Sequence, residues 1–370
     1  MGGITGHLKH LYEYDSLDGR ELGSIVTNLM LGRIAVTEKV DGLNIQVSMD
    51  SDRNIVFIRN NGDINSAKGG MSIEDIFEKW KDNDEVRNCY LYGASELENI
   101  LCGYDPTFFN PDVNTKRALN VECVCGQTNV IPYACKSIYI HNVFVYKRTV
   151  KGWVNTDIEN LPADLERFKS PILTIKGVDL STVNDYLKLL YAVIPMDMTI
   201  KEYKFNKFIA WCKEFEPWIL EEEYATDVLF HRWFQGIKEF NLKELKKIYG
   251  DNADRLVFLD KGFRHIVNSV MKDLDKTIIT IGQVVLGACK GYINEGSDIN
   301  MLTGFMDAVD ALMESDNEEI VFKLNKQLER LNGVIYPFEG IVFEWNGMLI
   351  KMTGNFAPYN QIMGMIRFGR

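Results

Sequence analysis

The hydrophobic pattern of this chain changes character twice along its length, and that change limits the architectures it can adopt. Residues 34–58 and 340–352 alternate apolar and polar positions, whereas residues 161–331 repeat their apolar positions with helical spacing. Alternation is typical of half-buried strands, and a period near 3.6 is typical of amphipathic helices. The sequence therefore predicts a sheet-rich part built from both chain ends, with a helical segment between them.

We expect an α+β fold of twisted antiparallel sheets with helices, divided into two domains. Residues 1–160 and 332–370 would form one domain, and residues 161–331 an all-helical insertion that serves as a substrate-specificity module. A chain of 370 residues is long for one domain and sufficient for two. The helical spacing is clearest over residues 181–193, 204–215, 241–249, 263–273 and 318–331.

Turn residues mark the strand ends in the N-terminal part. A strand over residues 34–37 runs through Lys39 into an Asp-Gly turn, and a strand over residues 44–49 follows. The next strand, over residues 55–59, runs into Asn-Asn-Gly at residues 60–62, another turn signal. These features predict an antiparallel meander with Lys39 at the end of a strand.

Two further local signals concern a helix and a hairpin. Ser72 is suited to cap the N-terminus of a helix over residues 72–81, because its hydroxyl can accept a hydrogen bond from a backbone N–H of the first turn. Asn346-Gly347 lies between two apolar runs, which is the strongest short-range signal for a β-hairpin. We therefore expect a hairpin over residues 340–352.

The composition excludes some classes of protein. A formal net charge of -11 disfavours a protein that coats nucleic acid non-specifically, although a local basic groove stays compatible with it. The seven cysteines have no paired Cys-x-x-Cys spacing, so we expect reduced thiols in a cytoplasm-like compartment and no zinc site. The sequence has neither a basic-then-apolar leader nor an apolar run of about 18 residues, so we expect no signal peptide and no membrane span.

Two short runs carry side chains suited to phosphate chemistry. Residues 37–42 read Thr-Glu-Lys-Val-Asp-Gly, and residues 339–343 read Glu-Gly-Ile-Val-Phe, with Lys351 shortly after. A lysine attacks phosphorus only as the neutral amine, so neighbouring cations or desolvation must favour that form. Glu122 and Glu339 are candidates for metal or ribose contacts, because hard cations take oxygen ligands.

Each of these residues also has a purely structural interpretation. Lys39 alone fits a surface hairpin, Glu339 a turn that enters a strand, and Glu122 a charge that faces the edge of a sheet. Independent surface residues have no reason to occur in this order with matching apolar flanks. Their combination therefore favours a catalytic site.

Residues 37–44, Thr-Glu-Lys-Val-Asp-Gly-Leu-Asn, resemble the first motif of the covalent nucleotidyltransferases, and their form is most similar to that of ATP-dependent RNA ligases that seal nicks. The resemblance implies that Lys39 becomes the lysyl-AMP and that Glu38 reads the adenine amino group. It implies that Asp41 and Gly42 belong to the same nucleotide-binding motif. It also implies an ATP-grasp-like ligase domain, and we expect no C-terminal OB-fold because the sequence stops soon after the last motif.

Later segments resemble the remaining motifs of that family. Arg59 would contact the nucleotide or product phosphate, Glu122 the ribose or metal, and His141 would occupy the place of an aromatic residue that stacks on the base. Glu339 matches the fourth motif and would also bind metal. Lys351 matches the fifth motif in part and would act with Lys39 in catalysis.

The resemblance implies an ATP-dependent ligase that joins 5'-phosphate and 3'-hydroxyl ends of RNA, with ATP and Mg²⁺ as cofactors. Its partners would be RNA ends, in a nicked duplex or a tRNA, and not membranes. Alternatives are GTP-dependent capping, AMPylation of proteins, and a decayed ligase that only binds nucleotide or RNA. Thr353 stands where the family has a second lysine, which keeps the last alternative open. Residues 353–361 are similar to ligase-like proteins of tailed phages, which implies the host cytoplasm.

Overall fold

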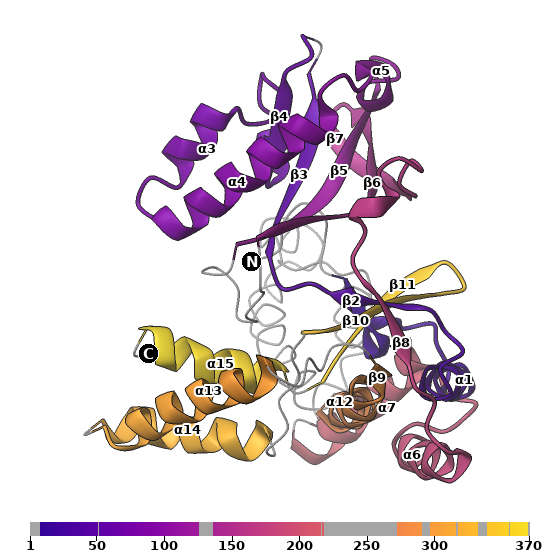
Figure 1. Cartoon of the computed structure of the whole chain (residues 1–370). Helices are drawn as coiled ribbons and strands as arrows, with labels where there is room; N and C mark the ends of the chain where they lie inside the picture. The colour runs from indigo at the N-terminus through magenta and orange to yellow at the C-terminus, as the bar shows by residue number, and fades with distance from the viewer. Residues whose placement is uncertain are drawn as a thin grey trace.

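The computed structural model describes residues 8–50, 52–125, 136–215, 217, 272–290, 297–315, 317–331, 339–354 and 356–368, and its strands form two sheets (Figure 1). The six-stranded sheet has the order β1 (Lys9–His10), β11 (Met348–Thr353), β10 (Gly340–Trp345), β2 (Val36–Lys39), β8 (Ile172–Ile175) and β9 (Cys289–Lys290). The five-stranded sheet has the order β4 (Ile55–Ile58), β3 (Leu43–Met49), β5 (Thr115–Val124), β6 (Ser137–Thr149) and β7 (Gly152–Glu159). Among the strand pairs of the described residues, only β1 and β11 run in parallel, so these are antiparallel-rich sheets of a mixed α/β fold.

Distant parts of the chain share the six-stranded sheet. β2 pairs with β10 on one side and with β8 on the other, and Val36 lies opposite both Phe343 and Leu173. All three of these side chains are buried in one hydrophobic core. The hairpin of β10 and β11 turns at Asn346 and Gly347, whose positive φ angles of 48° and 77° confirm the predicted Asn-Gly turn.

Four helices contribute apolar side chains to the same core as the six-stranded sheet. They are α1 (Gly19–Met30), α6 (Leu180–Val193), α7 (Ile200–Phe215) and α12 (Lys272–Gly287). α12 passes close to β11, because a β-carbon on Gly282 would lie 3.0 Å from the carbonyl oxygen of Thr353. A glycine at that position lets the helix backbone approach the sheet.

The five-stranded sheet is covered on one face by α3 (Ile73–Lys79), α4 (Asp84–Leu101) and α5 (Pro106–Phe109). Buried side chains from alternate positions of β3 and β5, such as Val47 and Leu119, pack there against Leu97 of α4. The predicted cap of α3 is confirmed, because the Ser72 hydroxyl accepts a hydrogen bond from the backbone N–H of Asp75 at 3.2 Å. Two further short helices belong to this part of the chain, α2 (Asn61–Ile64) and the 3-10 helix η2 (Glu166–Phe168).

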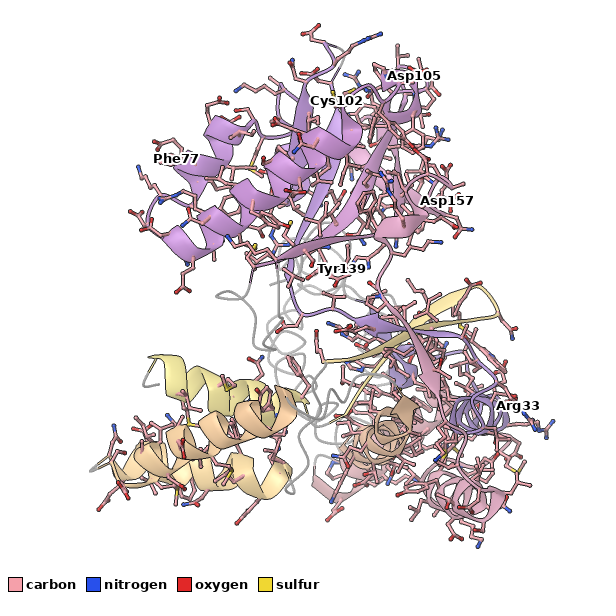
Figure 2. The ribbon with its side chains drawn as sticks, in the orientation of Figure 1. Arg33, Phe77, Cys102, Asp105, Tyr139 and Asp157 are labelled. Atoms are coloured by element: carbon pink, nitrogen blue, oxygen red, sulfur yellow. A yellow bond between two sulfur atoms is a disulfide. The ribbon has the colours of Figure 1, made fainter. Side chains whose placement is uncertain are left out.

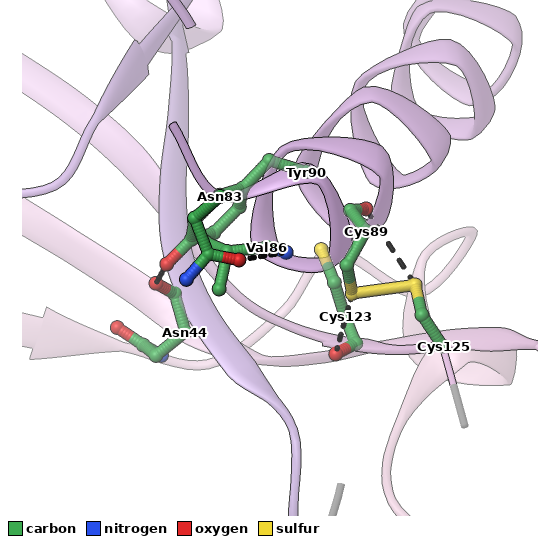
Figure 3. Close-up of a disulfide and its surroundings, with 7 residues drawn as sticks. All are labelled: Asn44, Asn83, Val86, Cys89, Tyr90, Cys123 and Cys125. Carbon is green, nitrogen blue, oxygen red and sulfur yellow. Dashed lines mark hydrogen bonds between the residues drawn. A yellow bond between two sulfur atoms is a disulfide. The ribbon is translucent and has the colours of Figure 1, made fainter. Parts of the chain in front are cut away.

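A disulfide joins Cys89 of α4 to Cys125 at the end of β5 (Figure 3). The expectation that all thiols are reduced was therefore wrong for this pair. Cys102 is exposed and free, and Cys123 and Cys289 are buried and free. The close approach of α4 to β5 brings the two bonded cysteines together although 36 residues separate them in the sequence.

The expected meander around Lys39 was wrong. β2 belongs to the six-stranded sheet and β3 to the five-stranded sheet, so residues 40–42 link two sheets and do not form a hairpin turn. The second turn signal, at residues 60–62, also has another role. Asn60 caps α2, and its side chain accepts hydrogen bonds from the backbone N–H groups of Gly62 and Asp63.

The segment over residues 161–331 is not all-helical as expected, because it contains β8 and β9. β8 pairs with β2, so its Leu173 and Ile175 enter the core of the six-stranded sheet. The helices expected over 181–193, 204–215 and 318–331 are confirmed by α6, α7 and α14 (Glu318–Leu331). The helix expected over 241–249 lies outside the described residues, as does that over 263–273 except for its last two, which begin α12.

The remaining helices, α13 (Ser297–Met313), α14 and α15 (Phe356–Phe368), pack together around their own core (Figure 1). Phe305, Leu324 and Ile362 contribute one buried side chain each from the three helices. The chain leaves α14 toward the β10–β11 hairpin and returns from it into α15. No helix in the described ranges is both long enough and apolar enough to cross a membrane.

Candidate active site

The pairing of β2 with β10 brings the two sequence runs together. Lys39 lies opposite Gly340 in the register, so Lys39 and Glu339 are neighbours although 300 residues separate them. The ammonium group of Lys39 donates a hydrogen bond to the carboxylate of Glu339 and forms an ion pair with it. The side chains retain only 21% and 16% of their exposure, so the pair is partly shielded from solvent.

Lys351 is the second cation of this site. It lies opposite Val342 on β10, and Val342 lies opposite Thr37 on β2. Directly opposed residues of antiparallel strands share a face of the sheet, so Lys351 and Thr37 are on the same face. Alternation along β2 puts Lys39 on the same face as Thr37, and therefore on the same face as Lys351. Burial is the main cause that lowers the pKa of Lys351 to about 8, and the positive charge of Lys39 is the second. The negative charges of Glu13 and Glu339 oppose that change.

Glu38 is placed on the other face of β2. It lies opposite Ile341, which is fully buried in the core, and is itself only 1% exposed. Its backbone N–H donates to the carbonyl oxygen of Pro171 at 2.9 Å. The structure therefore does not bring the Glu38 side chain together with Lys39 and Lys351, and its contact with adenine stays a prediction.

Asp41 and Gly42 lie in the link between the sheets, directly after Lys39. A β-carbon on Gly42 would lie 2.7 Å from Cγ of Glu122 and 2.8 Å from the carbonyl oxygen of Cys123. The absence of a side chain at this position therefore allows the link to pass against β5. This contact brings Glu122, from the five-stranded sheet, to the side of Lys39.

Three carboxylates act on one another at this junction. The pKa of Glu339 is raised, first by burial and further by the negative charges of Asp41 and Glu122, while the ion pair with Lys39 opposes the increase. Burial of like charges favours the protonated form of a carboxyl group. Glu339 is therefore a better proton acceptor than an exposed glutamate.

Glu122 lies opposite Asn44 of β3 and Tyr139 of β6. Figure 2 shows Tyr139 at the end of the five-stranded sheet nearest to β2. The Asn44 amide donates to Oε2 of Glu122 at 3.3 Å and to Oδ1 of Asn120 at 2.7 Å. Asn44 is thus a further site residue. It is the last residue of the motif at residues 37–44, for which the motif predicted no separate role.

His141 occupies a β-bulge of β6. Asn142 pairs with Asn120 and Ile140 pairs with Val121, so His141 is the extra residue between them. Bulges re-aim side chains beside functional sites. Here the ring nitrogen Nε2 lies 3.7 Å from Oε2 of Glu122, and the side chain is 28% exposed.

Arg59 follows β4, and its backbone N–H donates to Oδ2 of Asp63 at 2.8 Å. Burial raises the pKa of Tyr90 to about 12; the nearby charge of Arg59 opposes this increase, and that of Glu122 adds to it. The Tyr90 hydroxyl in turn donates to the carbonyl oxygen of Asn44 at 3.3 Å (Figure 3). Arg59 and Glu122 therefore both lie within electrostatic range of Tyr90.

The site offers oxygen ligands for a metal ion, although the described residues contain no group of three or more His, Cys, Asp or Glu side chains suited to hold one. Mg²⁺ is commonly held by one or two carboxylates with substrate phosphates completing its shell, so a larger cluster is not required. Glu122 and Glu339 fit that requirement, because their mutual repulsion would be relieved by a cation.

No family model matches the chain, and no curated protein matches its sequence. Among solved structures, an archaeal ATP-dependent RNA ligase aligns over 99% of this chain and 82% of its own length, with 10% identity and a TM-score of 0.23. A TM-score this low defines no common fold. The function proposed below therefore rests on the residues of this chain.

Proposed function

We propose that this chain is an ATP-dependent polynucleotide ligase that acts on RNA through a covalent AMP on Lys39. The observation that carries the proposal is the partly buried ion pair of Lys39 with Glu339, with Lys351 on the same face. A lysine amine beside a carboxylate of raised pKa and a second cation is suited to attack phosphorus and to hold phosphate oxygens.

In the first step, the carboxylate of Glu339 takes a proton from Lys39. The neutral amine attacks the α-phosphorus of ATP, a phosphorus–nitrogen bond forms, and the bond to the bridging oxygen breaks to release pyrophosphate. Lys351 and Arg59 hold phosphate oxygens during the transfer. Mg²⁺, held by Glu122 and Glu339, would supply further neutralisation of phosphate charge.

The next two steps use the same residues. An RNA 5'-phosphate oxygen attacks the AMP phosphorus, the bond to Lys39 breaks as the departing nitrogen takes the proton back from Glu339, and a 5'–5' anhydride forms. A 3'-hydroxyl then attacks the RNA 5'-phosphorus, loses its proton, and displaces AMP. Asp41, Gly42 and His141 would contact the nucleotide in these steps, and Glu38 would read the base.

The two parts of the chain would have different tasks in this reaction. Residues 1–160 and 332–370 would supply the adenylation chemistry. Residues 161–331, which contribute β8 and three helices to the core beneath Lys39, would also modulate which RNA ends bind. The protein would work in the cytoplasm, in the host cytoplasm if a phage encodes it. A lack of the second lysine, with Thr353 in its place, would slow one of the three steps without abolishing the first.

Incubation with α-labelled ATP and Mg²⁺, followed by denaturing electrophoresis, tests the proposal. We expect the wild type to retain label, Lys39→Ala to lose it, and Lys188→Ala, at an exposed position of α6, to retain it. Label on the Lys39→Ala protein would contradict the assignment. Labelling by α-labelled GTP alone would favour capping, label transfer to added proteins would favour AMPylation, and RNA binding without any adduct would favour a decayed ligase.

A further inference from the structure

A serine outside every motif bridges the two sheets beside the candidate site. Ser170 directly precedes Pro171 and β8 of the six-stranded sheet and is only 6% exposed. Its Oγ lies 3.3 Å from Nδ1 of His141, which belongs to the five-stranded sheet. On the other side of the imidazole, Nε2 faces Glu122.

The neighbours of His141 favour one tautomer of the ring over the other. The carboxylate of Glu122 lies 3.7 Å from Nε2, which is too far for a hydrogen bond, but it attracts an N–H group and so favours a proton on Nε2. Nδ1 is then the acceptor, and the Ser170 hydroxyl donates to it. Each nitrogen of the ring therefore faces a polar neighbour, and the side chain as a whole stays 28% exposed.

The position of Ser170 is itself tied to the strand that carries Lys39. The carbonyl oxygen of the next residue, Pro171, accepts a hydrogen bond from the backbone N–H of Glu38, and Ile172 lies opposite Thr37. Any shift of Ser170 would disturb these contacts. The orientation of the His141 ring is thus coupled to the backbone around the candidate nucleophile.

We propose that Ser170 is a positioning residue of the nucleotide site, which fixes the His141 ring so that the face of the ring stacks on the base of ATP. This inference rests on the proposed ATP-dependent function. A ring held in advance loses less freedom when the nucleotide binds, so the contribution falls on nucleotide binding. Loss of the hydroxyl lets the ring rotate and weakens stacking, while the amine of Lys39 keeps its partner.

Kinetics of adduct formation with ATP distinguish this role from a general structural one. Ser170→Ala should raise KM for ATP roughly 2- to 10-fold, as expected for one lost hydrogen bond, with kcat within about twofold of wild type. Ser170→Thr retains a hydroxyl and should restore KM toward the wild-type value. Ser24→Ala, at an exposed position of α1, controls for the substitution. Equal losses in kcat and kcat/KM for Ser170→Ala would overturn the proposal.

A double substitution and a spectrum give independent readouts. In the His141→Phe protein, a ring remains but has no nitrogen to hold, so adding Ser170→Ala should change KM less than twofold; a full additive loss would contradict the proposal. Nitrogen-15 NMR of the wild type should show His141 protonated on Nε2, and Ser170→Ala should shift the ring toward a mixture of tautomers. An unchanged ring spectrum together with an unchanged KM would overturn the proposal.

Failure of the ligase proposal gives a different result from failure of this inference. A wild type that forms no adduct refutes the covalent chemistry, whereas a normal adduct with an unaffected Ser170→Ala variant refutes only the role of Ser170. If the wild type forms no adduct, a titration with ATP followed by NMR still tests the role of Ser170. The His141 resonances should then move in the wild type and require at least twofold more ATP to move in Ser170→Ala, and equal titration curves would overturn the proposal.

Discussion

Gly42 lies directly against the side chain of Glu122, so closely that a β-carbon on Gly42 would come within 2.7 Å of Cγ of Glu122. This contact joins the link that follows Lys39 to the five-stranded sheet. The two sheets therefore meet at a glycine, and the candidate site depends on the absence of one methyl group.

Gly42→Ala should displace the link or Glu122, because the other close atom, the carbonyl oxygen of Cys123, belongs to the backbone and cannot swing away. We expect adduct formation to slow at least about tenfold and the free energy of unfolding to fall by about 1–3 kcal/mol. Gly364→Ala is the matched control, because a β-carbon there meets no atom within 4 Å. Rates from label incorporation and midpoints from urea titration measure both effects; wild-type values for Gly42→Ala would contradict the close contact.

Glu339→Gln tests the proton acceptor. The amide retains the shape of the side chain but cannot take a proton from Lys39, so adduct formation should slow by a factor of about 10²–10⁴. Stability should stay equal or rise slightly, because burial already disfavours the ionised carboxylate. Glu344→Gln, at an exposed position of the same strand, should react like the wild type. Rapid labelling of the Glu339→Gln protein would exclude the glutamate as the base.

Lys351→Met should change how stability depends on pH. Burial lowers the pKa of Lys351 in the folded state to about 8 from its usual value of 10.5, so between these pH values the unfolded chain binds more protons than the folded one. The free energy of unfolding of the wild type should therefore rise through this window, by up to about 1.4 kcal/mol per pH unit from this residue. Urea titrations from pH 7 to pH 11 should show a shallower rise for Lys351→Met, with Lys188→Met as the control for the substitution. Parallel curves for wild type and Lys351→Met would contradict the prediction.

Removal of the disulfide should destabilise the five-stranded sheet and its helices. A bond that closes a loop of 36 residues contributes about 4 kcal/mol in the chain-entropy model. Cys89→Ser should therefore lower the free energy of unfolding by an amount of that order, and a reducing agent should do the same to the wild type. Cys102→Ser, which removes an exposed free thiol, should have no such effect. Equal stability of the wild type with and without reductant would show that the bond does not form in solution.

Local structure was predictable wherever neighbouring residues decide it. The cap at Ser72, the turn at Asn346-Gly347 and helix α14 follow from hydrogen bonding, backbone preference and helical spacing within short windows. Lys39 at the end of a strand was predicted for the same reason and is confirmed by β2. These features need no knowledge of distant partners.

Long-range pairing was not predictable in the same way. The pattern of residues 34–49 is identical for a hairpin and for two strands in separate sheets, and only the partner β10 distinguishes them. β8 has four residues within a helical block, too short for a clear alternation. The Cys89–Cys125 bond and the contact of Ser170 with His141 depend on tertiary packing, which short sequence windows do not encode.

The same difference between local signals and strand pairing applies to the site residues. Lys39, Glu339 and Lys351 were proposed from motif order, and the structure brings all three to one place. Alternation along β2 puts the Glu38 side chain on the opposite face of the strand from Lys39. The motif alone did not predict this difference, because it gives the order of residues and not the face on which each lies.

The central position of β2 has a consequence for biosynthesis. Its β10 partner is encoded 300 residues later, so the nascent strand has an open edge on that side until the residues of β10 have been synthesised. Unpaired strand edges invite association with other chains. Association through this open edge would therefore compete with folding during elongation, and a message truncated before codon 339 would yield a product that lacks Glu339 and Lys351.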